Sequence, residues 1–282
     1  MKLLITGGAG MLALALSRRL GSEHEIVPFG REDLDVTAQP RVREALRSVQ
    51  PEAVLHCAAW TDVDGCERDP VRALRVNGSG AGHIASAAAA LGVPVVHFST
   101  DYVFDGSAVD PYREEDEPRP INAYGRSKLA GEVAVRDAAD RHFILRTSGL
   151  FGIGGRSFPA AILDAARAGR PLDVVSDQCL APTYAPHLAD GVARVLSSDR
   201  YGTYHVTSSG RADWFTYAGA ILEEAGLRGV ALRPISTEAS GRAAPRPAFS
   251  VLDTGRFQKT FGWTAPGWRE GLREFLGEVG AL

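Results

Sequence analysis

The first twenty residues contain the feature that most constrains the fold, a short apolar strand that runs directly into a glycine-rich turn. The strand is expected at Lys2 to Thr6 and a helix at Met11 to Leu20. Between them lies the sequence Gly7-Gly8-Ala9-Gly10-Met11-Leu12-Ala13, which has the pattern G-x-x-G-x-x-A. Glycines let the backbone turn tightly and approach a pyrophosphate, whose charge a helix N-terminus meets. Such turns are often only structural, but a place at the first strand–helix junction favours a dinucleotide site.

The same alternation of strand and helix continues through about half of the chain. Further strands are expected at Glu25–Phe29, Pro51–His56, Val95–Tyr102 and His142–Arg146, with helices at Gln39–Val49, at Asp69–Leu91 and from Tyr124. This order predicts an α/β fold with a parallel, doubly wound sheet of the Rossmann type. We expect residues 1–150 to form the NAD(P)-binding domain. Residues 151–282 are expected to form a smaller α/β substrate-binding lobe, with the chain crossing between the two.

Elements are also expected in this second part. The pattern there indicates helices at Phe158–Ala168, Ala185–Leu196, Asp213–Ala225 and from Trp268, with strands at Leu172–Val175 and Gly202–Thr207.

Composition excludes several classes of protein. The net charge of −3 argues against a general affinity for nucleic acid or anionic membranes. No apolar run approaches the ~18 residues of a membrane span, and the N-terminus has no cleavable signal pattern. The cysteines (Cys57, Cys66 and Cys179) are odd in number and lack metal spacing, and the seven histidines are scattered. We therefore expect a cytoplasmic protein without a metal site.

Tyr124 and Lys128 are spaced four residues apart on an expected helix. Residues at this spacing share a helix face, with roughly 5–6 Å between their Cβ atoms. A neighbouring ammonium stabilises a phenolate, so the pKa of Tyr124 is expected to lie below its usual value of about 10. A tyrosine tuned in this way can transfer a proton near neutral pH, as carbonyl reduction requires. Such pairs also arise by chance on exposed helices.

Further candidates follow the other strands. Arg31, after the second strand, favours binding of the 2′-phosphate of NADPH. The acidic neighbours Glu32 and Asp33 leave NADH open as the cofactor, and Arg31 could also be a solvated surface residue without a binding role. Small residues after the third strand, Ala58 and Ala59, leave room for a flat ligand at the sheet's carboxyl edge. Asn77 is either a polar helix-face residue or a support for a loop near this edge.

Taken together, these motifs resemble the dTDP-4-dehydrorhamnose reductase family of the extended short-chain dehydrogenase/reductase superfamily, over nearly the whole chain. The matching segments are Gly7-x-x-Gly10, Leu34–Thr37, Ala58–Asp64, Ser99–Phe104, Tyr124-x-x-x-Lys128 with Leu129–Glu132, Leu145–Ser148, Asp177-Gln178 with Pro182-Thr183, and Arg246-Pro247 with Leu252-Asp253. Because all of these segments occur together and in the same order as in the family, chance does not explain the resemblance.

The resemblance implies a catalytic set and two binding sets. Tyr124 would donate the proton to the sugar C4 oxygen, Lys128 would hold the nicotinamide ribose, and Thr100 would hydrogen-bond the carbonyl. The implied cofactor-binding residues are Gly7, Gly10, Met11, Leu12, Arg31, Asp35, Val36, Ala58, Ala59, Trp60, Thr61, Ser99, Tyr124 and Lys128. The implied substrate-binding residues are Thr61, Val63, Thr100, Asp101, Tyr102, Gln178 and Arg246. The implied cofactor is NADPH and the implied substrate a dTDP-linked 4-keto-6-deoxysugar.

The sequence departs from the family at two places. The family's Thr-Ser-Trp is Thr147-Ser148-Gly149 here, which predicts open space where a tryptophan would border the sugar. Some relatives bind magnesium at a dimer interface through a glutamate on the first helix, where this chain has Ala15. We therefore expect a monomer, or a homodimer without a bridging metal.

Three alternative functions follow from the resemblance. Nucleotide-sugar 4,6-dehydratases place Asp-Glu after the threonine, whereas Asp101 is followed here by Tyr102, which favours simple reduction. A 4-ketoreductase for another dTDP-deoxysugar stays open because of Gly149. A non-catalytic NADP-binding regulatory subunit would not need Thr100, Tyr124 and Lys128, all of which are present.

Overall fold

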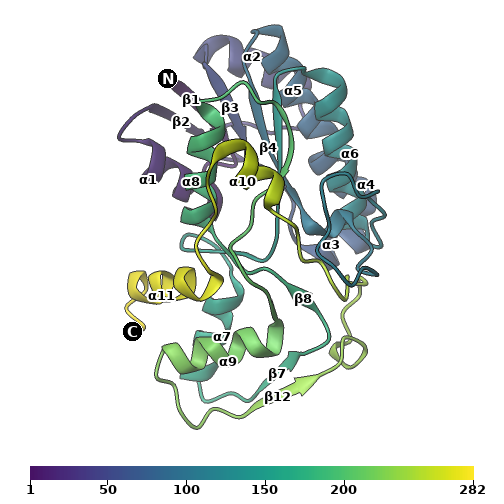
Figure 1. The fold of residues 1–282 in the computed structure, drawn as a ribbon. Helices are drawn as coiled ribbons and strands as arrows, with labels where there is room; N and C mark the ends of the chain where they lie inside the picture. Colours follow the sequence, from purple (N-terminus) through teal and green to yellow (C-terminus); the bar gives the residue numbers. More distant parts are fainter.

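The computed structural model describes residues 1–282, and one half of the molecule is built on a six-stranded sheet (Figure 1). Its strands are β1 (Lys2–Thr6), β2 (Glu25–Phe29), β3 (Ala53–His56), β4 (Val95–Thr100), β5 (His142–Thr147) and β10 (Gly202–His205), in the spatial order β10-β5-β4-β3-β1-β2. All neighbouring strands are parallel. The strand order reverses beside β1, which is where doubly wound sheets open a crevice for ligands. The predicted Rossmann-type fold is confirmed.

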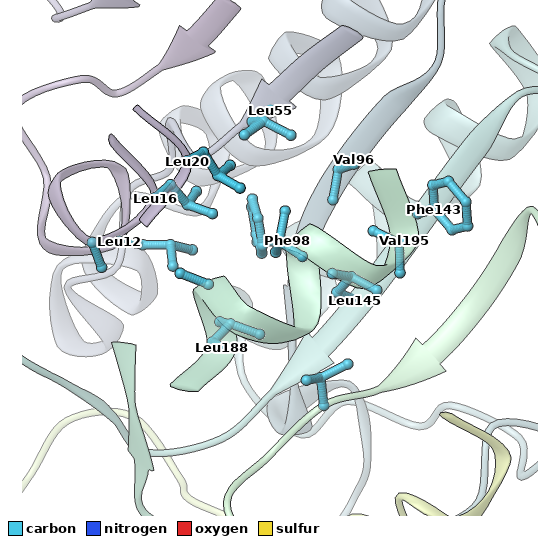
Figure 2. Packing of buried hydrophobic residues seen from close by; sticks show 14 of the residues in the cluster. Leu12, Leu16, Leu20, Leu55, Val96, Phe98, Phe143, Leu145, Leu188 and Val195 are labelled. Carbon is cyan, nitrogen blue, oxygen red and sulfur yellow. The ribbon is translucent and has the colours of Figure 1, made fainter. Parts of the chain in front are cut away.

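Helices cover both faces of this sheet. One face packs against α1 (Met11–Leu20) and α8 (Ala185–Leu196), and the other against α2 (Gln39–Val49), α5 (Gly80–Ala90) and α6 (Ala123–Ala138). Side chains alternate between the faces of a strand, so Leu3 and Ile5 enter the first core and Leu4 the second. Figure 2 shows the first core, in which leucines of α1 and α8 gather around Phe98 of the central strand.

The expected elements of the first half are largely confirmed, with two differences. The long helix expected at residues 69–91 is divided into α4 (Pro70–Ala73), a π-helical turn (Leu74–Ser79) and α5. A short helix α3 (Val63–Arg68) was not expected, because six residues are too few to show a helical period. Both features place side chains near the ligand edge described below. No helix of the structure has the length and apolar character needed to cross a bilayer.

The second half has its own core, in the lower part of Figure 1. Its main elements are α7 (Phe158–Arg167), β7 (Leu172–Val175), α9 (Trp214–Glu224), β12 (Leu232–Ile235) and α11 (Trp268–Glu278), with β12 parallel to β7. The shorter elements are β6 (Leu150–Phe151), β8 (Cys179–Leu180), β9 (Thr183–Tyr184) and β11 (Ala212–Asp213), whereas α10 (Gly255–Phe261) packs into the first core through Phe257. The division at residue 150 stays a prediction, since α8 and β10 lie beyond it in sequence but pack with the first half.

Candidate active site

The turn after β1 is shaped to approach a charged ligand closely. Gly7 has a φ of +68°, and a Cβ there would lie 2.8 Å from the backbone nitrogen of Ala58. The N–H of Gly10 donates a 2.8 Å hydrogen bond to the carbonyl of Gly7. Helix α1 has no side-chain cap and no acidic residue in its first turn, so its first amides are free to bind an anion. The turn therefore fits the pyrophosphate of a dinucleotide, with Leu12 limited to its backbone because its side chain enters the core.

Residues after β2 form the second part of this edge. Arg31 is exposed and makes no ion pair, so its guanidinium is available to a phosphate. Asp35 accepts hydrogen bonds from the backbone and hydroxyl of Thr37, and these lower its pKa. The carbonyl of Val36 lies 3.0 Å from a ring nitrogen of His83 on α5. These contacts hold the segment where the adenosine end of a dinucleotide was expected.

Asn77 fixes the loop after β3. Its Oδ1 accepts a 2.7 Å hydrogen bond from the N–H of Trp60, and its Nδ2 donates to the carbonyl of Trp60 at 3.0 Å. Nδ2 also lies 2.9 Å from the Ser127 hydroxyl on α6. The π-helical turn therefore places the side chain to bind both backbone groups of one residue, and the suggestion that Asn77 supports a loop is confirmed. This loop contains Ala58, Ala59 and the exposed Thr61, and ends where Val63 begins α3.

Thr100 and Tyr124 meet at the carboxyl end of β4. The Asn122 side chain caps α6 by accepting from the Gly125 N–H, and this places Tyr124 in the first turn. Burial raises the pKa of Tyr124, whose phenol lies beside the Thr100 hydroxyl. The ring of Tyr102 stands edge-on to that of Tyr124, with centroids 5.9 Å apart. A protonated phenol beside a hydroxyl can donate a proton to a carbonyl oxygen.

The expected lowering of the Tyr124 pKa is therefore wrong for this structure. The prediction considered only the nearby Lys128, whereas burial of the phenol disfavours the charged phenolate more strongly. The negative charge of Asp101 adds to the rise. The consequence suits reduction, since a proton donor must hold its proton at neutral pH.

Lys128 is enclosed between α6 and the sheet. Its ammonium donates a 2.6 Å hydrogen bond to the carbonyl of Phe98, and the residue is 3% exposed. Burial lowers the pKa of Lys128 to about 8, against a smaller upward effect of Glu132. The lysine is thus a buried cation one helical turn from the tyrosine, as the spacing predicted.

Ser99 is turned toward α6. Its hydroxyl donates a 2.6 Å hydrogen bond to the carboxylate of Glu132, which also pairs with Arg146 at 2.7 Å. Burial is the largest single effect and pushes the pKa of Glu132 upward, but the hydrogen bonds and charges of Arg146, Ser99 and Arg136 together outweigh it, and the pKa is lowered. Ser99 thus contributes to a buried ion pair behind the edge, and its expected role toward the cofactor stays a prediction.

The expected substrate-binding residues are not gathered into one cluster of free side chains. Gln178 is buried, and its amide bonds to Trp214 Nε1 at 3.1 Å and to the Thr237 hydroxyl at 2.8 Å. Arg246 donates two hydrogen bonds to Asp64 of α3, at 2.8 and 3.2 Å. Gln178 therefore stabilises the interior of the second half of the chain. Arg246 connects a loop of the second half to α3 in the first half.

Asp101 is likewise occupied by neighbours. The residue is 3% exposed, and its carboxylate accepts hydrogen bonds from the hydroxyls of Thr100, Ser148 and Ser250. Ser148 and Ser250 were not predicted as partners of this group, although Ser148 lies inside the Leu145–Ser148 motif and Ser250 lies close to the Leu252-Asp253 motif. Single serines have no spacing pattern that would identify them.

The expectation of open space at Gly149 is wrong. Gly149 has a φ of +53°, and a Cβ there would lie 2.5 Å from Cδ1 of Leu180 and 3.2 Å from Cα of Pro182. The glycine is required by the backbone and by the segment packed against it. A tryptophan cannot be introduced there without displacing that segment.

Comparison with known proteins extends these observations. A family model described as "RmlD substrate binding domain" matches residues 1–280. The spore coat polysaccharide biosynthesis protein SpsK of Bacillus subtilis is 40% identical, over 98% of this chain and 97% of its own length. A dTDP-4-dehydrorhamnose reductase of Sinorhizobium fredii is 39% identical, again over 98% and 97%. The crystal structure of the Bacillus anthracis dTDP-4-dehydrorhamnose reductase in complex with NADP superposes with a TM-score of 0.96 at 36% identity, covering 98% of this chain and 99% of that one.

Proposed function

The chain belongs to the dTDP-4-dehydrorhamnose reductase family, and from that premise we propose that it reduces the C4 ketone of a dTDP-linked 4-keto-6-deoxysugar with NADPH. The sugar we favour is dTDP-4-dehydro-L-rhamnose, which gives dTDP-L-rhamnose. The observation that carries this proposal is the group formed by Thr100, Tyr124 and Lys128 at the carboxyl end of β4. A regulatory subunit that only binds NADP would not require these three side chains.

The cofactor supplies the hydride when it is bound. The free amides of α1 would hold the pyrophosphate, and Arg31 would hold the 2′-phosphate at the adenosine end of the cofactor. Asn77 keeps the loop around Trp60 in place along the nicotinamide side. Lys128 brings a positive charge to the same side, where it would bind the ribose hydroxyls.

Tyr124 holds the proton that the sugar oxygen receives. Its raised pKa, caused by burial, keeps the phenol protonated at neutral pH, and the neighbouring Thr100 hydroxyl would orient it. The proton moves from the phenol oxygen to the C4 oxygen as negative charge develops there. General acid catalysis of this kind contributes about 10²–10⁴-fold to the rate.

The test is a direct assay with defined substrates. NADPH consumption is followed at saturating dTDP-4-dehydro-L-rhamnose, and the product is identified by NMR. Turnover with formation of dTDP-L-rhamnose supports the proposal. Turnover only with a different dTDP-4-keto-6-deoxysugar would correct the sugar. Tight NADPH binding without turnover of any such sugar would overturn the activity and indicate a regulatory subunit.

A further inference from the structure

The carboxylate of Asp101 accepts hydrogen bonds from three hydroxyl groups that lie in separate parts of the chain. Oδ1 lies 3.0 Å from the Thr100 hydroxyl, and Oδ2 lies 2.7 Å from that of Ser148 and 2.6 Å from that of Ser250. All four residues are at most 6% exposed. An ionised carboxylate has no proton to donate, so each hydroxyl must be the donor. Burial raises the pKa of Asp101, and the hydrogen bonds of the three hydroxyls stabilise the charged form against that effect.

This arrangement decides the direction of the Thr100 hydroxyl. Because its proton is directed to Asp101, its oxygen faces the rest of the site as an acceptor. The N–H of Tyr102 donates to that oxygen at 3.2 Å, which limits its rotation further. Thr100 can then accept a hydrogen bond from Tyr124, but it cannot donate one to a substrate carbonyl while Asp101 is ionised.

Ser250 lies on a segment that is held from both sides. The N–H of Cys179 donates to the carbonyl of Ala248, and the N–H of Ser250 to the carbonyl of Cys179, at 2.8 and 2.9 Å. On the other side, the N–H of Tyr112 donates to the carbonyl of Val251 at 2.9 Å. The segment thus connects β8 in the second half with the loop after β4 in the first. Its rigidity fixes the position of the Ser250 hydroxyl.

We propose that Ser250 is a positioning residue that acts through Asp101 to set the orientation of the Thr100 hydroxyl, and so of the proton on Tyr124. The proposal rests on the proposed reductase function. It makes the second half of the chain a contributor to the proton-transfer step, in addition to binding the sugar. Ser250 would touch neither cofactor nor substrate in this role.

A positioning role predicts a dependence on Thr100 that a packing role does not. If Ser250 acts only through Asp101 and Thr100, its removal has no further effect once the Thr100 hydroxyl is gone. A double-mutant cycle between Ser250→Ala and Thr100→Val measures this directly. Ser250→Cys is run beside it, because a thiol fills the same space but is a weak donor.

We expect Ser250→Ala and Ser250→Cys to lower kcat about ten- to a hundredfold in the wild-type background, as small displacements of reacting groups do. In the Thr100→Val background the same changes should alter kcat less than about twofold. The NADPH dissociation constant should stay within about twofold in every variant, since none of the residues lies at the pyrophosphate. The matched control is Ser208→Ala, because Ser208 is 2% exposed and its hydroxyl has no partner.

The outcomes separate the two proposals. If the wild type turns over and the Ser250 variants lose kcat equally in the wild-type and Thr100→Val backgrounds, Ser250 has only a packing role and the positioning role is overturned. Wild-type turnover with unchanged kcat in both Ser250 variants would overturn it as well. If the wild type itself fails to turn over any dTDP-4-keto-6-deoxysugar, the proposed function is wrong and the positioning role is withdrawn with it.

Discussion

The ammonium of Lys128 and the backbone carbonyl of Phe98 are joined by a 2.6 Å hydrogen bond inside the fold. A single neutral carbonyl compensates a buried charge only in part, and the pKa of Lys128 accordingly falls from 10.5 to about 8. The charge of Lys128 is therefore destabilising in the folded state.

A pH dependence of stability follows from this lysine. Between pH 8 and 10.5 the unfolded chain binds more protons at this group than the folded chain does, so its effect on stability becomes more favourable as pH rises through this window. At pH 7 the full cost is present, with an upper limit of roughly 3 kcal/mol. We expect Lys128→Met to raise the free energy of unfolding at pH 7, by less at pH 9.5, while turnover is lost. Urea denaturation of the wild type and the variant at pH 7 and pH 9.5 measures the two changes in the free energy of unfolding, and the NADPH assay measures turnover. A Met variant less stable than the wild type at pH 7 would contradict this account.

Tyr124→Phe is expected to remove catalysis and keep cofactor binding. In the proposed role the phenol acts only at proton transfer, so kcat should fall by about 10²–10⁴-fold, with the NADPH dissociation constant within about threefold of the wild type. Tyr102→Phe is the matched control, since its ring stacks edge-on against Tyr124 at 5.9 Å. That variant should lose less than about tenfold. A fall of less than about tenfold in Tyr124→Phe would remove this tyrosine from its role.

Arg31→Asp should shift the preference from NADPH toward NADH. A guanidinium–phosphate contact contributes about 1.5–3 kcal/mol, so the ratio of kcat/KM for NADPH over NADH should fall at least about tenfold. Arg167→Asp changes the net charge equally from the exposed face of α7 and should leave the ratio unchanged. A wild type that already prefers NADH would show that Arg31 does not bind a 2′-phosphate.

Gly149→Ala should destabilise the fold through two effects that can be measured apart. The positive φ costs about 1 kcal/mol for an alanine, and contact with Leu180 adds about 1–3 kcal/mol. Gly169→Ala isolates the first effect, because Gly169 has a φ of +65° with no atom within 4 Å of a Cβ. Thermal or urea unfolding of the two variants gives the difference. Equal losses would mean that Leu180 moves aside without cost.

Local sequence determined much of this protein. Strands, helices and the glycine turn follow from hydrophobic period and backbone preference over a few residues, so β1, α1, β2 and α2 lie where their sequence places them. The spacing of Tyr124 and Lys128 predicts one helix face for the same reason, since helical geometry is fixed by neighbours along the chain.

Only the tertiary structure decided what surrounds these groups. Asp101 receives hydroxyls from residues 47 and 149 positions away, and no local pattern relates such distant serines to one carboxylate. The pKa of Tyr124 depends chiefly on burial in the folded chain, which raises it, whereas the sequence shows only the neighbouring Lys128, which was expected to lower it. Gly149 is likewise confined by Leu180, thirty-one positions later, because close packing is a property of the folded chain and not of any one segment.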